Sequence, residues 1–265
     1  MKIGFIGLGN MATAMIGGML EKGLVTSGDI IGSAKTTATI EKIMTRFNIT
    51  TVPENKKVAE QADVLFLAVK PIFLSEVIEE IKDVVRPETL IVSIAAGRTL
   101  AYLREAFGRP ELKLVRCMPN TPALVMEGCT GICAGADVTE EELERIVGLM
   151  EAFGKASVVP ERLMDVVVGV SGSSPAYVFM FIEAMADEAA AAGMPRKQAY
   201  EFAAQSVLGS AKMVLETGKH PGELKDMVCS PGGTTIEAVK VLEEKGFRAA
   251  VMDAMEACIE KSKNM

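Results

Sequence analysis

Histidine and cysteine are scarce in this sequence, which limits the kinds of site it can form. His220 is the one histidine among 265 residues, and its Gly-Lys-His-Pro-Gly setting predicts the entry turn of a helix. The five cysteines are odd in number and none are spaced as C-x-x-C. These counts argue against a Cys/His zinc site, and we expect no metal. Reduced thiols fit the cytosol, so we expect a cytoplasmic protein.

The chain also lacks a basic block and a convincing membrane segment. Its formal net charge is −7, and no basic stripe with aromatic residues occurs, so we expect no nucleic-acid partner. Residues 1–20 are apolar but carry only Lys2 as a basic residue and no small-residue cleavage pattern. The apolar stretch Val166–Met185 contains Ser171–Pro175 and Glu183, which predicts a loop entering a buried helix. We therefore expect no membrane association.

Short apolar runs alternate with helical patterns over the first 160 residues. Runs such as Val64–Val69 are apolar throughout, which is typical of parallel strands covered on both faces. This order predicts an α/β fold with a Rossmann-type doubly wound parallel sheet. The predicted strands are Lys2–Ile6, Ile30–Ser33, Thr50–Val52, Val64–Val69, Leu90–Ala95, Lys113–Cys117, Cys129–Ala134 and Ala156–Val159. The predicted helices among them are Met11–Lys22, Thr39–Phe47, Phe73–Val84, Leu100–Phe107 and Glu140–Phe153.

After Pro160 the strand signals disappear and alanine and methionine become frequent. We therefore predict two domains, 1–160 and 161–265, the second all-helical. Its long apolar helices can complete their core against a second copy of the chain. The predicted helices are Pro175–Ala192, Pro195–Glu216, Pro221–Val228, Thr235–Glu244 and Phe247–Lys261.

A G-x-G-x-x-A pattern follows the first predicted strand and opens the first predicted helix. Gly7 permits a tight turn, Gly9 lets a pyrophosphate approach the backbone, and Ala12 keeps the helix close to the sheet. We interpret residues 1–160 as a dinucleotide-binding domain. The alternative is a glycine turn that binds nothing.

The second predicted strand ends without the Asp or Glu that binds the ribose 2′-hydroxyl in NAD-selective domains. Ser33, Lys35 and Thr36 can instead donate to a 2′-phosphate. We expect NADPH as the cofactor, with NADH as a second reductant; the alternative is a polar turn without a ligand. Pro71 ends the fourth strand, which predicts that Lys70 projects into the crevice at the sheet edge, although a solvated loop lysine fits equally well.

The segment Ser230–Glu237 reads Ser-Pro-Gly-Gly-Thr-Thr-Ile-Glu. Thr234 and Glu237 have the spacing of a capping box, which predicts Thr234 as the N-cap. The two preceding glycines leave backbone N–H groups unobstructed for a carboxylate, and Thr235 adds a hydroxyl. The alternative is a capped helix that binds nothing. Ser174 likewise reads as the N-cap of a helix that starts at the following proline.

Together these segments resemble pyrroline-5-carboxylate reductase over essentially the whole chain. The family reduces Δ1-pyrroline-5-carboxylate to L-proline with NAD(P)H, the last step of proline biosynthesis. The resemblance implies a Rossmann domain followed by a helical domain that interlocks with its partner in a homodimer, and five such dimers often form a decamer. The segments that carry it are Gly4–Ala12, Val64–Pro71, Arg116–Pro122, Gly169–Tyr177, His220–Asp226 and Ser230–Ile236.

The resemblance also implies the site residues. The substrate carboxylate is expected on the backbone amides of Gly233, Thr234 and Thr235, with the Thr235 hydroxyl near the ring nitrogen. Glu161 matches a position that contributes to the proline pocket in some members. Met227 and Gly218 depart from the family pattern, since other members carry polar or acidic residues there. The implied cofactor contacts are Leu8, Gly9, Asn10, Met11, Ser33, Asn55, Ala68, Val69, Lys70 and Ala96, beside Gly7 and Lys35 from the motifs above.

No histidine is placed to act as an acid. We therefore expect Thr235 to orient the substrate, while the proton comes from water or arrives with the substrate. Two other readings stay open on the residues alone. A β-hydroxyacid dehydrogenase shares the glycine loop, but its G-x-x-G-x-x-x-K-x-x-N run is absent. The second alternative is a nucleotide-sensing or scaffold protein without catalytic activity.

Overall fold

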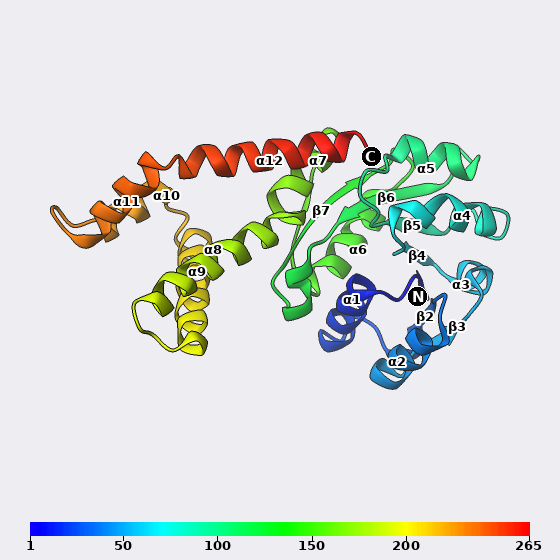
Figure 1. Cartoon of the computed structure of the whole chain (residues 1–265). Helices are drawn as coiled ribbons and strands as arrows, with labels where there is room; N and C mark the ends of the chain where they lie inside the picture. The colour runs from blue at the N-terminus through cyan, green and yellow to red at the C-terminus, as the bar shows by residue number, and fades with distance from the viewer. The chain divides into compact units, whose positions relative to one another are not determined.

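Eight strands form one sheet in the order β3-β2-β1-β4-β5-β6-β7-β8 in the computed structural model, which describes all 265 residues (Figure 1). The paired strands are parallel except β6 and β7, which are antiparallel. The connection between these two holds only the 3₁₀ helix η2 (Thr121–Val125), which is too short for the crossover that a parallel pair requires. The predicted doubly wound sheet is confirmed, with this one reversal. The strands are β1 (Ile3–Ile6), β2 (Ile30–Ser33), β3 (Thr50–Val52), β4 (Val64–Leu67), β5 (Leu90–Ser93), β6 (Lys113–Met118), β7 (Gly128–Ala134) and β8 (Gly154–Val158).

Helices cover both faces of this sheet (Figure 1). Side chains of β1 alternate between two cores: Phe5 lies in the core shared with α1, α2 and α6, and Ile6 in the core shared with α3, α4 and α5. The Phe5 ring stacks on Phe66 of β4 with 4.8 Å between ring centroids. Burial on both faces explains why these strands are apolar throughout. The helices are α1 (Asn10–Glu21), α2 (Thr37–Phe47), α3 (Asn55–Gln61), α4 (Pro71–Ile81), α5 (Leu100–Phe107) and α6 (Glu140–Glu151).

The chain is helical after β8. It divides into two compact units, one made of Met1–Ser173 with Cys258–Met265 and the other of Ser174–Ala257. The first unit extends past residue 160 because Met164 is buried in a small cluster with Met118 of β6 and Cys133 of β7. The elements are η1 (Ser27–Asp29) in the first half, then η3 (Glu161–Leu163), α7 (Met164–Val167), η4 (Val168–Gly172), α8 (Ser174–Ala191), α9 (Arg196–Thr217), α10 (Pro221–Val228), α11 (Thr234–Glu244) and α12 (Phe247–Lys263).

The segment around Ser171 is helical, which corrects the predicted loop. η4 is a π-helical turn between α7 and α8, and the Ser173 N–H donates to the Val168 carbonyl five residues earlier over 2.8 Å. Ser174 is therefore not the N-cap of a new helix, as the sequence predicts, but continues a helical run. A π turn absorbs one extra residue without ending the helix, and such turns are frequent at functional sites.

Pro175 determines how the helical run is joined to the polar loop after β6. Because proline has no N–H, the Ser171 carbonyl four residues earlier lacks its usual helical donor. The buried Asn120 side chain supplies the replacement, with 2.9 Å between Nδ2 and that carbonyl oxygen. Its Oδ1 accepts from the Cys129 N–H over 2.8 Å. Asn120 thus fastens the helical run to the loop before β7.

Candidate active site

The glycine loop joins β1 to α1 at the carboxyl end of the strand. Gly7 has φ +96°, and a Cβ there would lie 2.6 Å from the Ala68 carbonyl oxygen, so only glycine fits. Gly9 differs, because it has φ −77° and a Cβ there would meet no atom within 4 Å. Neither the backbone nor the packing requires glycine at position 9. The open space suits a group outside the chain, and α1 begins there without a side-chain cap.

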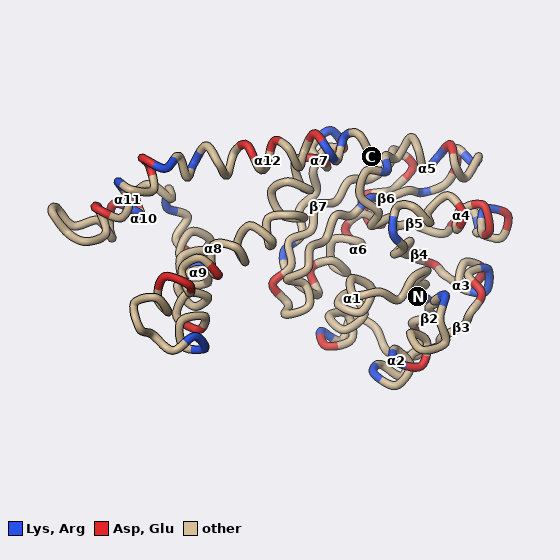
Figure 2. The backbone as a smooth tube through the Cα atoms, viewed as in Figure 1, with Lys and Arg blue, Asp and Glu red and all other residues tan.

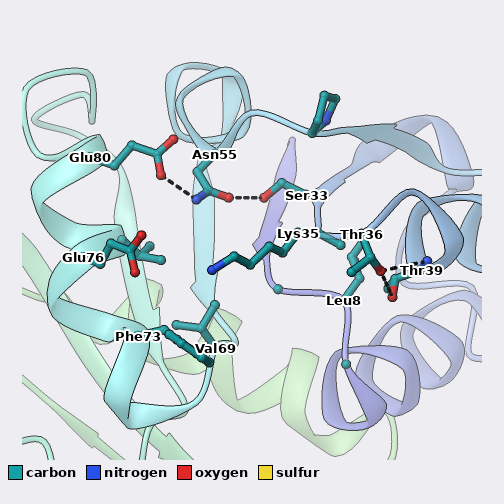
Figure 3. A pocket seen from close by; sticks show the side chains of 15 residues that line it. Leu8, Ser33, Lys35, Thr36, Thr39, Asn55, Val69, Phe73, Glu76 and Glu80 are labelled. Atoms are coloured by element: carbon teal, nitrogen blue, oxygen red, sulfur yellow. Dashed lines mark hydrogen bonds between the residues drawn. The ribbon is translucent and has the colours of Figure 1, made fainter.

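A cavity of about 430 Å³ opens beside this loop (Figure 3). It lies where the strand order reverses between β1 and β4, the point at which open α/β sheets bind ligands. Seven of the twelve predicted cofactor residues line it: Gly7, Leu8, Gly9, Ser33, Lys35, Asn55 and Val69. The other lining residues are Ala34, Thr36, Thr39, Pro53, Phe73, Glu76, Val77 and Glu80.

The five remaining predicted cofactor residues lie outside the lining of this cavity. Asn10 and Met11 form the first turn of α1. Ala68 and Lys70 flank Val69 after β4, and Lys70 is the exposed N-cap residue of α4, followed by a proline at the first helical position. Ala96 follows β5 and packs against the Met118 cluster.

The polar side chains of the cavity are largely engaged with one another. Ser33 Oγ donates to Asn55 Oδ1 over 2.7 Å, and Asn55 Nδ2 donates to Glu80 Oε2 over 2.7 Å (Figure 3). Thr36 is the N-cap of α2, and its Oγ1 accepts from the Thr39 N–H. Lys35 places its Nζ over the Phe73 ring, 5.3 Å from the centroid, and forms no ion pair. The Thr36 and Thr39 hydroxyls share a hydrogen bond of 2.9 Å in which either can donate. Lys35 is therefore the predicted phosphate donor with no hydrogen bond to a neighbouring side chain.

Glu161 lies at the start of η3, where its carboxylate joins three elements. Oε1 accepts from Arg116 Nη1 of β6 and from the Leu100 N–H of α5, each over 2.7 Å. The Arg116 side chain is only 5% exposed, whereas that of Glu161 is 35% exposed. This ion pair orients Glu161 and neutralises a buried guanidinium.

Two buried thiols of the first unit are kept protonated. Burial raises the pKa of Cys117 far above its usual range, and it raises the pKa of Cys133 to about 11 in spite of the neighbouring Arg116. All five cysteines are free thiols, and no group of three or more His, Cys, Asp or Glu side chains is arranged to hold a metal ion. Neither Cys117 nor Cys133 is suited to act as a thiolate nucleophile.

In the second unit, α11 begins one residue earlier than the sequence predicts. The N-cap is Gly233, with φ −80° and ψ 170°, and Thr234 is already helical. The predicted capping box is therefore wrong, because the glycine takes the extended conformation that the cap requires and leaves Thr234 inside the first turn. No side chain caps this helix. Gly233 N–H donates to the Ser230 carbonyl, and Thr235 is half-buried at the second helical position. The first-turn N–H groups are open to an anion.

Two further positions of the second unit, His220 and Gly218, have structural explanations, and Met227 has none. His220 caps α10, with its Nδ1 accepting from the Gly222 N–H over 3.0 Å, so the predicted helix-entry role is confirmed. Gly218 ends α9 with φ +64°, a left-handed conformation that glycine adopts without strain. Met227 is exposed on α10.

Over its whole length the chain is similar to known enzymes of one kind. Pyrroline-5-carboxylate reductase of Escherichia coli (strain K12) is 54% identical over 264 residues, which cover 100% of this chain and 98% of that protein. The chain belongs to the pyrroline-5-carboxylate reductase family. Residues 161–265 match the family model for pyrroline-5-carboxylate reductase dimerisation, and residues 2–97 match the model for NADP oxidoreductase, coenzyme F420-dependent.

Structures of pyrroline-5-carboxylate reductases agree with this assignment. The structure from Coxiella burnetii has a TM-score of 0.91 at 33% identity, covering 99% of this chain and 97% of that one. The enzyme of Plasmodium falciparum, with NADP bound, has a TM-score of 0.89 at 31% identity and the same coverage. The predicted family and fold class are thus confirmed.

Proposed function

We propose that the chain reduces Δ1-pyrroline-5-carboxylate to L-proline with NADPH, the last step of proline biosynthesis. The observation that carries the proposal is the open space in front of Gly9, which we call the cradle. It lies beside a cavity that seven predicted cofactor residues line, in a chain that belongs to this family. A glycine that neither conformation nor packing requires is explained by close approach of a ligand.

The first unit supplies the cofactor site. The N–H groups after Gly9 and the start of α1 bind the pyrophosphate, and Lys35 binds the 2′-phosphate. The absence of an acid at the end of β2 supports NADPH, as does NADP in the Plasmodium falciparum relative. A bound reduced nicotinamide supplies the hydride, while the protein positions the reactants and excludes water.

The second unit supplies the substrate site. The backbone amides of Thr234 and Thr235 bind the substrate carboxylate, because the uncapped start of α11 presents N–H groups and the positive end of a helix dipole. Gly233 contributes the open approach to these amides, since its own N–H donates to the Ser230 carbonyl. The Thr235 hydroxyl orients the ring nitrogen. With His220 engaged as a cap, no side chain serves as a dedicated acid, and water or a protonated substrate supplies the proton. Glu161 stays a predicted member of the proline pocket.

The test is to mix the purified protein with Δ1-pyrroline-5-carboxylate and NADPH, follow the loss of nicotinamide absorbance, and identify proline by chromatography. We expect substrate-dependent oxidation. Oxidation of a 3-hydroxy acid with NADP⁺ instead would favour the β-hydroxyacid dehydrogenase alternative. Cofactor binding without turnover of either substrate would favour a sensor or scaffold. Parallel assays with NADH measure the cofactor preference.

We also propose that residues 161–265 form a homodimer and residues 1–160 the cofactor domain. The helical run Glu161–Ala191 is long and apolar enough to cross a membrane, judged by length and composition alone. Only 11% of its most apolar 18-residue segment is buried within the chain. Figure 2 shows the first half of α8 without charged residues, and Phe179 and Met180 there are 62% and 69% exposed. The dimerisation-model match supports a second copy of the chain, rather than lipid, as the cover for this face.

Light scattering of the detergent-free protein tests this, and it separates a dimer from a decamer by mass. Phe179→Asp should release monomers, whereas Leu24→Asp, which also replaces an exposed apolar side chain by a carboxylate but in the first unit, should not. A monomeric wild-type protein, or one that requires detergent to stay in solution, would contradict the proposal. We place the enzyme in the cytoplasm, in keeping with its five free thiols.

A further inference from the structure

The cavity contains the acids that the end of β2 lacks. Glu76 and Glu80 project from α4 on the side opposite the end of β2, and Lys35 extends from that end toward them (Figure 3). Lys35 is the only basic residue in the lining, and neither glutamate forms an ion pair. The part of the cavity beside Ser33 therefore carries more negative than positive charge. That is unexpected for a site that binds only a 2′-phosphate.

Glu80 is connected to the end of β2 by a chain of two hydrogen bonds. Asn55 Nδ2 donates to Glu80 Oε2, and Ser33 Oγ donates to Asn55 Oδ1, each over 2.7 Å. An ionised carboxylate can only accept, so the Asn55 amide must turn its nitrogen to Glu80 and its oxygen to Ser33. The Ser33 hydroxyl proton is thereby committed, and this side chain is 0% exposed. Ser33 holds Asn55 in place and has no proton left for a phosphate.

We propose that Glu80 is a cofactor-specificity residue that replaces, from α4, the acid missing after β2. Its carboxylate accepts a hydrogen bond from a ribose 2′-hydroxyl and repels a 2′-phosphate, which Lys35 attracts. The site consequently binds both NADH and NADPH, and Glu80 sets the ratio of the two affinities. The inference rests on the proposed function, because it takes this cavity as the cofactor site.

The test measures binding of two fragments that need no catalysis, 2′,5′-ADP and 5′-AMP, by titration calorimetry. Glu80→Gln keeps the length of the side chain and an oxygen that accepts from Asn55, but it removes the charge. We expect the ratio of the two dissociation constants to shift about fivefold toward 2′,5′-ADP, the effect of removing one unit charge about 4 Å from another where both are exposed to water. The shift should shrink at high salt, because exposed charges are screened. The kcat/KM ratio for NADPH over NADH should move in the same direction.

Glu79→Gln is the matched control. Glu79 lies on the same helix but outside the cavity lining, and it pairs with Lys82 over 2.8 Å. This variant loses the same charge and should leave the ratio within twofold of wild type. A ratio unchanged in Glu80→Gln, an equal weakening of both fragments, or an equal shift in Glu79→Gln would overturn the inference. A wild-type protein that binds neither fragment would instead contradict the proposed cofactor site itself.

Discussion

Substituting alanine at Gly9 separates the two demands on the glycine loop, stability and cofactor binding. Gly9 has an ordinary extended backbone, and a Cβ there meets nothing within 4 Å. Two effects on stability then oppose each other: removing a glycine from the unfolded chain gains about 0.4–1 kcal/mol, whereas alanine is a poorer N-cap residue than glycine by a similar amount. The melting temperature should therefore stay within about 4 °C of wild type. The same methyl group occupies the space that we assign to the pyrophosphate, so NADPH binding should weaken by at least about tenfold, or ~1.4 kcal/mol.

Gly7→Ala should instead lose stability in the same assays. Its φ of +96° costs an alanine about 1–3 kcal/mol, and the 2.6 Å approach to the Ala68 carbonyl adds a steric term. The melting temperature should therefore fall by several degrees. Scanning calorimetry measures stability, and the fluorescence of bound NADPH measures affinity. Wild-type cofactor affinity in Gly9→Ala would refute our assignment of the pyrophosphate to the open space at Gly9. Wild-type stability in Gly7→Ala would refute the argument that residue 7 is strained without glycine.

Four further predictions concern other parts of the chain. Thr235→Ala should lower kcat substantially and Thr235→Ser should restore most of it; turnover within twofold of wild type in the alanine variant would remove Thr235 from the mechanism. Arg116→Met leaves a partly buried carboxylate unpaired and should cost about 2 kcal/mol in urea unfolding, less than for a fully buried pair. Asn120→Ala orphans a carbonyl and an N–H and should also cost about 2 kcal/mol. Because burial raises the pKa of Cys133 from 9.0 to about 11, its contribution to stability is complete below pH 9 and is lost as the pH rises through 11. The unfolding free energy of wild type should therefore fall more steeply over that range than that of Cys133→Ala.

Much of the fold follows from local patterns in the sequence. The predicted bounds of β2, β3, α5 and α10 coincide with the structure, because apolar runs and turn residues mark them clearly. The helix α3 is not predicted, since it has seven residues and only Val58 and Ala59 buried, too few for a periodic pattern. The π turn before Pro175 could not be predicted from the sequence either. Its stability depends on Asn120, a donor about fifty residues away.

The site was less predictable than the fold because its groups modify one another across elements. The motif identifies Ser33 as a donor, but its proton is taken by Asn55, which begins α3. Glu80 carries no signal of its own in the sequence, because it is one of several exposed glutamates on α4. Only the three-dimensional arrangement shows that Glu80, unlike the other glutamates of α4, is linked to Ser33 through hydrogen bonds of Asn55.

The N-cap residues of α1 and α11 connect these observations. Gly9 and Gly233 have almost the same conformation, with φ −77° and −80°, and both are extended, so neither needs to be glycine for backbone reasons. A serine, threonine or aspartate at either position would bond to a first-turn N–H and stabilise its helix by about 1 kcal/mol. Side-chain caps occur at Thr36, Thr99 and Thr139, whereas α3, α4 and α9 begin without one but have Glu54, Lys70 and Pro195 rather than glycine as the N-cap. A side-chain cap would occupy the N–H groups that an anion requires. At α11 the sequence even places Thr234 within one residue of the cap, yet the glycine takes that position. Stability is forgone at the two helix starts to which we assign a pyrophosphate and a carboxylate, as expected if these N–H groups are kept for ligands.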